Sequence, residues 1–197
     1  IYTANYGSDN VSKITPSSYP APPARPAVPT AVTGAGGATV TVTANPLSAA
    51  NGASSLYTFT AVQDSSKHCT TSFVLRSCVV SGLTNGTAYT FTTTASLATW
   101  QTAASAPSNS ITPAAAPDAP TALVATPGNA SASIAFTPGA SNGAAVTNYE
   151  YKLDDGSWTA MSPSVTISPI AIAGLTNGTS YAIRLRALNS AGAGAQS

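Results

Sequence analysis

Hydrophobic and polar residues alternate in short rows along the chain from about residue 30 onward. Each row places apolar side chains at every second position, with mostly polar residues such as threonine between them. Three rows are clearest, and each is written here by the residues that share one face of the predicted strand: Val40-Val42-Ala44, Tyr57-Phe59-Ala61 and Tyr89-Phe91-Thr93-Ala95. A period of two is typical of strands with one face on a core and one in water, and no segment sustains a helical period. The pattern predicts an all-β fold of antiparallel sheets.

The pattern occurs twice. Residues Leu83–Tyr89 spell Leu-Thr-Asn-Gly-Thr-Ala-Tyr, and Leu175–Tyr181 repeat this phrase with one residue changed, at an offset of 92 residues. At the same offset the three rows have the counterparts Ala132-Ile134-Phe136, Tyr149-Tyr151 and Tyr181-Ile183-Leu185-Ala187. We therefore expect two copies of one domain of seven short strands, which predicts a β-sandwich. Copy 1 denotes residues 29–113 and copy 2 denotes residues 120–197, with a linker at 114–119.

Both copies resemble fibronectin type III domains of the Thr/Ser-rich kind common in bacterial secreted and surface proteins. The resemblance is carried by the Pro-Thr-Ala entries at Pro29 and Pro120, the strand tyrosines, the two repeated phrases and the closing strand Ala106–Pro113. It implies two immunoglobulin-like β-sandwiches in tandem. The family usually has a core tryptophan in its second strand; at the offset of 92, Ala44 and Phe136 occupy that place, which implies a lighter core in copy 1.

The resemblance also implies a structural role for the repeated phrase. Its leucine would close one end of the sandwich, its Asn-Gly would make a bend, and its tyrosine would begin the next strand as a tyrosine corner. Six residues are assigned to this structural corner: Leu83, Gly86, Tyr89, Leu175, Gly178 and Tyr181.

The residues before copy 1 differ in character. Residues 1–15 indicate strand, turn and strand, and resemble the hairpin repeat of secreted β-propellers. We interpret them as a hairpin remnant of an upstream domain, either a propeller or another β-domain, and the chain as a fragment of a longer polypeptide. Residues 16–28 are rich in proline and predict a semi-rigid extended linker, although Pro22–Pro26 also fits a proline-motif ligand.

Composition narrows the function classes. Charged residues make up 7% of the chain, against about 25% in ordinary soluble domains, and the net charge is +1 with no basic run. No electrostatic footprint for nucleic acid is therefore present. No apolar run reaches the roughly 20 residues that span a bilayer, so no membrane span is expected. No glycine-rich phosphate loop follows a strand, and no cofactor is expected.

The residue types that carry catalysis do not assemble into a set. His68 is the single histidine, and it adjoins Cys69, whose side chain would point to the opposite face of an extended strand. Asp154-Asp155-Gly156 indicates a hairpin turn, because calcium needs six to eight oxygen ligands. Glycosylation acceptors occur at Asn10, Asn85, Asn129 and Asn177, and turn chemistry explains Asn85 and Asn177 equally well. The sequence predicts no enzyme and no metal site.

Cys69 and Cys78 are the two cysteines, nine residues apart. Without a second cysteine or histidine pair they offer no four-ligand zinc set, so we predict a disulfide, with two buried thiols as the alternative. A disulfide implies an oxidising, extracellular setting. At the offset of 92 the cysteines match Met161 and Ile170, so we expect the crosslink to take the place of an apolar contact in copy 2.

Two functions are compatible with these features. One is a non-catalytic structural spacer of an extracellular multidomain protein. The other is an adhesion module for a polysaccharide or another surface protein, with Trp100 as the candidate ligand contact in a loop where copy 2 has Gly192. Trp100 could instead fold over its own domain edge, and Trp158 is expected to pack on its own sheet. Catalysis, by analogy with secreted glycan hydrolases, would belong to the parent protein.

One edge of copy 2 is expected to be uncovered. Ser197 matches Ser105, so this sequence holds no counterpart of the closing strand Ala106–Pro113 in copy 2. Proteins normally protect such edges. Residues Asn10–Pro16 resemble Ser108–Pro113, which suggests the hypothesis of self-association by strand exchange, with the N-terminal strand of one molecule filling the edge in another.

Overall fold

The computed structural model describes residues 24–34, 37–42, 55–97 and 100–197. The predicted hairpin of residues 1–15 and most of the linker 16–28 lie outside these residues. Within them every regular element is a β-strand. The strands of the N-terminal half are β1 (Pro29–Gly34), β2 (Gly37–Val42), β3 (Ser55–Ala61), β4 (His68–Ser72), β5 (Ser77–Ser81), β6 (Phe91–Leu97) and β7 (Trp100–Gln101). Those of the C-terminal half are β8 (Thr121–Gly128), β9 (Ser131–Thr137), β10 (Asn148–Leu153), β11 (Thr159–Ala160), β12 (Ile170–Ala173), β13 (Ile183–Asn189) and β14 (Gly192–Ala193).

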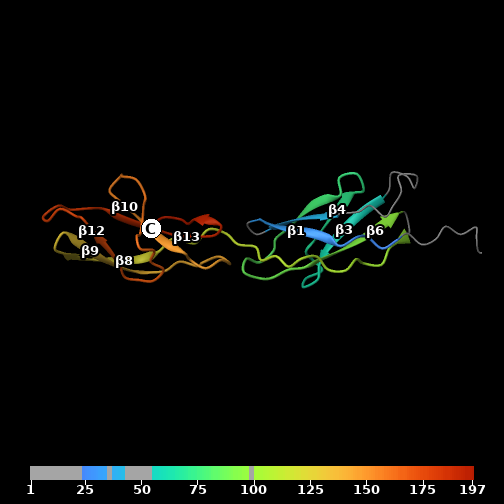
Figure 1. Cartoon of the computed structure of the whole chain (residues 1–197), viewed down its shortest axis with the longest axis horizontal. Coiled ribbons are helices and arrows are strands. Elements are labelled where there is room, and N and C mark those ends of the chain that lie inside the picture. The colour runs from blue at the N-terminus through green and yellow to red at the C-terminus, as the bar shows by residue number, and fades with distance from the viewer. Residues whose placement is uncertain (1–23, 35–36, 43–54, 98–99) are drawn as a thin grey trace, which may run out of the picture.

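In the described ranges the strands form four antiparallel sheets, two in each half of the chain. The first half holds sheets of order β1-β2-β5 and β4-β3-β6-β7, and the second holds β8-β9-β12 and β11-β10-β13-β14. The second pair repeats the first, strand for strand. Figure 1 shows the two groups of strands following one another along the long axis of the molecule. The prediction of an all-β fold with antiparallel sheets is confirmed.

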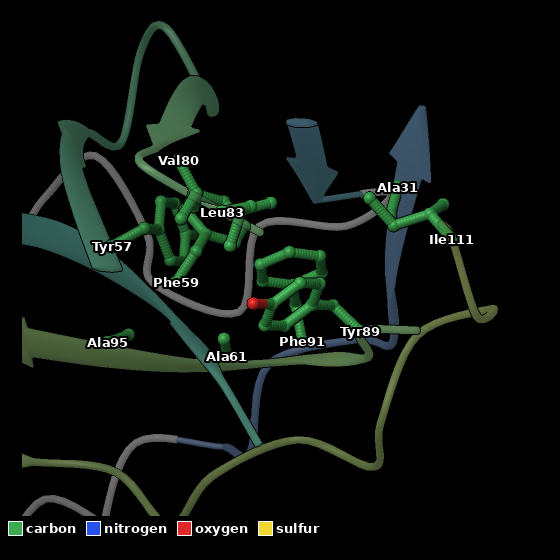
Figure 2. Close-up of a cluster of buried hydrophobic side chains, with 10 residues drawn as sticks. All are labelled: Ala31, Tyr57, Phe59, Ala61, Val80, Leu83, Tyr89, Phe91, Ala95 and Ile111. Carbon is green, nitrogen blue, oxygen red and sulfur yellow. The ribbon is translucent and has the colours of Figure 1, made fainter. Parts of the chain in front are cut away.

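Each half encloses its own hydrophobic cluster between its two sheets. In the first, Tyr57, Phe59 and Phe91 from one sheet and Val80 from the other are fully buried (Figure 2). In the second, Tyr149 and Leu185 face Ile134, Ile170 and Ile172 in the same way. The alternation of the sequence accounts for this arrangement, because residues two apart on a strand share a face. Two facing sheets with a shared core are consistent with a β-sandwich.

The second strand of each copy is aligned differently from the expectation. Val40 pairs with Cys78, and Ile134 pairs with Ile170. Since Cys78 and Ile170 match at the offset of 92, Val40 matches Ile134, and the offset in this strand is 94. Val42, not Ala44, therefore occupies the place of Phe136. The segment between the second and third strands is two residues longer in copy 1, and a shift of two keeps the same face on the core.

The core of copy 2 is filled at this place by an aromatic pair. The rings of Phe136 and Tyr149 meet edge to face, with centroids 4.7 Å apart and planes inclined by 62°. This geometry is favourable for aromatic pairs, because the positive edge of one ring meets the negative face of the other. Phe136 thus contributes a buried aromatic ring to the core of copy 2.

Candidate functional site

The predicted disulfide is present, and it links the two sheets of copy 1. Cys69 on β4 bonds to Cys78 on β5, with the two Cα atoms 6.2 Å apart. Both side chains are half-buried and pack against the core cluster of this copy. The alternative of two free thiols is thereby excluded. A bond between the facing sheets closes a short loop and ties both sheets to one core, a setting compatible with an extracellular protein.

The matching place in copy 2 differs in one detail from the expectation. Ile170 is fully buried and Met161 packs against the same cluster. Cys69, however, pairs with Phe59, whose counterpart Tyr151 pairs with Thr159. The Met161 amide donates instead to the carbonyl of Tyr149, which lies two residues before Tyr151 on β10. Met161 contributes to the apolar packing but is not the exact counterpart of Cys69.

The repeated phrase has the same geometry in both copies. The Thr84 amide donates to the Tyr89 hydroxyl over 3.1 Å, and the Thr176 amide donates to the Tyr181 hydroxyl over 3.1 Å. Hydrogen bonding from these threonines lowers the pKa of each tyrosine. Gly86 and Gly178 share φ = +80°, a backbone conformation that favours glycine. The environments differ, because Leu83 and Tyr89 are buried whereas Leu175 and Tyr181 are only half-buried.

Substituting the two corner tyrosines should destabilise the two copies to different degrees. We expect Tyr89→Phe to lower the denaturation midpoint of copy 1 more than Tyr181→Phe lowers that of copy 2. The reason is that the hydrogen bond from the Thr84 amide to Tyr89 is partly buried, whereas the one from the Thr176 amide to Tyr181 is exposed, so water replaces the lost hydroxyl more readily at the Tyr181 corner. Urea unfolding followed by near-ultraviolet absorbance would measure both midpoints. Equal losses in the two copies would contradict this explanation.

Copy 2 holds the linker 114–119 through hydrogen bonds from buried or half-buried asparagines. The Asn189 carboxamide, which is buried, donates to the carbonyls of Ala115 (2.8 Å) and Ser141 (2.9 Å). Asn142 donates to the Ala116 carbonyl and to Asp118 Oδ1, both over 2.9 Å. Because the partners are mostly main-chain carbonyls, this network fixes the path of the linker whatever small side chains the linker carries.

Main-chain hydrogen bonds complete the attachment of the linker. The amides of Ala115 and Asp118 donate to the carbonyls of Asn142 (2.8 Å) and Ala140 (2.9 Å). From the last residues of copy 2, the Ala195 amide donates to the Pro117 carbonyl over 3.1 Å. The linker is thus bonded along its length to two separate segments of copy 2.

The corner of copy 1 also meets copy 2 directly. The Gly86 amide donates to the Pro113 carbonyl over 2.9 Å, which brings the corner to the end of copy 1. There Gly143 lies against it so closely that a Cβ at position 143 would approach the Pro113 oxygen to 2.8 Å and the Asn85 carbonyl carbon to 2.9 Å. We call the linker together with Gly86 and Gly143 the junction. Sequence reasoning treated Gly86 as a local bend and did not single out Gly143, although Ser-Asn-Gly at 141–143 is a turn signal.

The other candidate residues have local roles where the structure describes them. Trp158 packs on its own sheet, as predicted: the Arg186 guanidinium lies 4.3 Å and the Lys152 ammonium 5.6 Å from its ring centroid. Arg186 also bonds to Glu150 over 2.6 Å. Asp154 accepts the Ala182 amide at the hairpin turn, over 2.8 Å. The backbone of Trp100 pairs with Leu97, and its side chain lies outside the described residues.

The described part of the chain lacks two further features. In the described ranges no three histidine, cysteine or acidic side chains are grouped closely enough to hold a metal ion. The same ranges contain no helix with the length and apolar character needed to cross a bilayer.

No protein-family model matches the chain, and no curated protein sequence is similar to it.

Proposed function

We propose that the chain is a pair of fibronectin type III-like sandwiches that act as a non-catalytic spacer in an extracellular multidomain protein. The repeated strand order and the repeated corner support two domains of one kind. The disulfide supports an oxidising environment. The low charge and the lack of a catalytic set in the sequence favour a mechanical role over chemistry.

The junction is the observation that carries the proposal. A spacer holds its ends at a set distance only if the joint between its domains is restrained, since domains on a free linker move independently by default. Here Asn189 and Asn142 fix the linker on copy 2, and Gly143 abuts the corner of copy 1. The restraint comes from amide and main-chain groups rather than from ion pairs, so it should not weaken with salt.

Small-angle X-ray scattering of the whole chain tests the proposal. We expect a distance distribution with two maxima, one within and one between the copies, that a single arrangement reproduces at both low and high ionic strength. Scattering that can be fitted only by a broad ensemble of distances between the two copies would overturn the proposed spacer function. Retention on an insoluble polysaccharide, lost in Trp100→Ala, would replace it with the adhesion module.

A further inference from the structure

The outer face of β10 and β13 concentrates the charges of the chain. Neighbouring residues of a strand point to opposite faces, so the residues that alternate with the buried Tyr149 and Leu185 point away from the core. Asp154 and Asp155 follow in the turn after β10. Four of the outward positions on the strands are charged: Glu150, Lys152, Arg184 and Arg186. Three of the 7 basic and three of the 6 acidic residues of the chain are thus gathered here, and we call this face with its turn the charged face.

The matching face of copy 1 is uncharged at the same four strand positions. At the offset of 92 the counterparts are all threonine: Thr58, Thr60, Thr92 and Thr94. Thr60 and Thr92 lie directly opposite each other on β3 and β6. Lys152 and Arg184 lie opposite each other on β10 and β13 in the same register. Because the sheet forms identically with threonine at these places, the fold itself does not require the charges of copy 2.

The centre of the charged face is neutral and fixed. Arg186 bonds to Glu150 over 2.6 Å, and only 26% and 17% of the two side chains are exposed. The Arg186 guanidinium also lies 4.3 Å from the ring centroid of Trp158, which precedes β11. Stacking of a guanidinium on an indole ring is favourable, because the cation meets the negative face of the ring. These three side chains hold one another in place.

The other four charges form two like-charged pairs. Lys152 and Arg184 are directly opposite on neighbouring strands, and like charges so placed destabilise a sheet. Asp154 lies one step farther along the same two strands, since it exchanges hydrogen bonds with Ala182 over 2.7 and 2.8 Å. Asp155 is exposed beside it. Among the described residues none of these four side chains forms an ion pair.

This arrangement of charges is complementary to itself. In a two-fold symmetric contact, a residue i that meets residue j is matched by j meeting i. If the axis passes between the two cations and the turn, the cations of each molecule lie on the acids of the other. Two cations and two acids on each side then leave no charge over. A different anion would approach the acids of the turn as closely as the cations, so the pattern favours a second copy over an anionic polymer.

We propose that the charged face of copy 2 is a contact surface for a second copy of this chain. Asp155 of each molecule meets Arg184 of the other, and Asp154 of each meets Lys152 of the other. Trp158 lies half-buried within the face and supplies the aromatic surface that protein contacts favour. The inference goes beyond the spacer function and does not depend on it, because the contact uses the side of copy 2 and not the junction.

The contact should be weak and sensitive to salt. Three strands of up to six paired residues offer a face of roughly 20 by 15 Å. This area is well below the roughly 800 Å² per partner of a standard interface. Exposed ion pairs add little each and are screened by salt. We therefore expect a dimer that forms at high local concentration.

Sedimentation equilibrium of the whole chain, up to about 2 mM, tests the proposal. At low ionic strength we expect a rise toward twice the 19.4 kDa chain mass. The rise should disappear in about 0.5 M NaCl, where screening acts within a few ångströms. Arg184→Glu should weaken the dimer roughly tenfold or more, because a symmetric dimer contains the changed contact twice. Arg76→Glu, the same change on an exposed residue of copy 1, is the matched control and should leave the dimer unaltered.

Mixing two variants identifies the residues that meet. Arg184→Glu and Asp155→Arg should each remain monomeric alone, since each variant places like charges at both contacts of its own dimer. An equal mixture should associate at least as strongly as the unmodified chain, because every contact then joins opposite charges. Association of the mixture also shows that both variants are folded. A single-chain mass at all concentrations in low salt would overturn the proposal. So would a dimer that Arg184→Glu leaves unchanged, or a mixture that stays monomeric.

Discussion

Reduction of the Cys69–Cys78 bond is expected to lower the unfolding free energy of copy 1 by about 2–3 kcal/mol and to leave copy 2 unchanged. The bond closes a loop whose ends are nine residues apart, and the chain-entropy estimate for such a loop gives this value. For a domain of this size the loss corresponds to a fall of roughly 10–20 °C in Tm. The expected effect is confined to copy 1 because both sulfurs pack against the core of that copy alone.

Calorimetry with and without a phosphine reductant measures this effect. After reduction, the transition of copy 1 should move to lower temperature and that of copy 2 should stay where it is. The double variant Cys69→Ser, Cys78→Ser is the control: it should reproduce the low transition and no longer respond to reductant. Movement of both transitions would mean that the copies unfold as one unit, and no movement would mean that the bond adds nothing to the stability.

The sequence was sufficient to predict the features that depend on local pattern. Period-two rows predicted which residues of β3, β6 and β13 face inward, because strand geometry alone decides that alternation. The repeated phrase predicted a bend at Gly86 and Gly178, and both glycines have the same positive φ. The presence of two cysteines without further zinc ligands in the sequence predicted the disulfide. In each case the residues that decide the outcome are close together in the sequence.

Features that depend on distant residues were not predictable in the same way. The two-residue shift of β2 relative to β9 follows from the different loops before the third strands, and a shift of two leaves the hydrophobic pattern unchanged. The contact of Gly143 with Gly86 joins residues 57 positions apart, and no periodicity reports such a contact. Asn189 is the last residue of β13, and nothing in the alternation of this strand marks it as different from its neighbours. It is buried because its side chain bonds to the linker.

The segment Thr102–Pro113, which covers the edge of β6 in copy 1, was only partly predictable from the sequence. Thr102, Ser105 and Ser108 are spaced by three, and this spacing is visible in the sequence, but strand prediction looks for a period of two. The segment is not part of a regular ladder, and it was therefore predicted only as a closing strand. The hydrogen bonds of its hydroxyls show why serine and threonine recur there: each satisfies an edge amide that a neighbouring strand would otherwise pair.

Replacing Gly143 with alanine is expected to release the junction while both cores stay folded. The added Cβ would lie 2.8 Å from the Pro113 oxygen and closer still to the Gly86 amide, so the main chain of one copy must move. Gly143 also has φ = +93°, which a non-glycine residue tolerates at a cost of about 1–3 kcal/mol. Because the contact lies outside both core clusters, the main consequence should be a wider range of separations between the copies. Paired spin labels on β3 and β10 would measure that range.

Gly178→Ala is the matched control, because it separates backbone strain from the loss of the contact. Gly178 has φ = +80°, but a Cβ there would meet nothing within 4 Å. The control should therefore destabilise copy 2 to a similar degree and leave the distribution of separations as narrow as in the unmodified chain. If Gly143→Ala also left it narrow, the close approach of Gly143 to Gly86 would not be what restrains the joint, and the asparagine bonds to the linker would have to suffice. If it broadened the distribution, a single methyl group at the junction would decide whether the two copies hold a fixed distance.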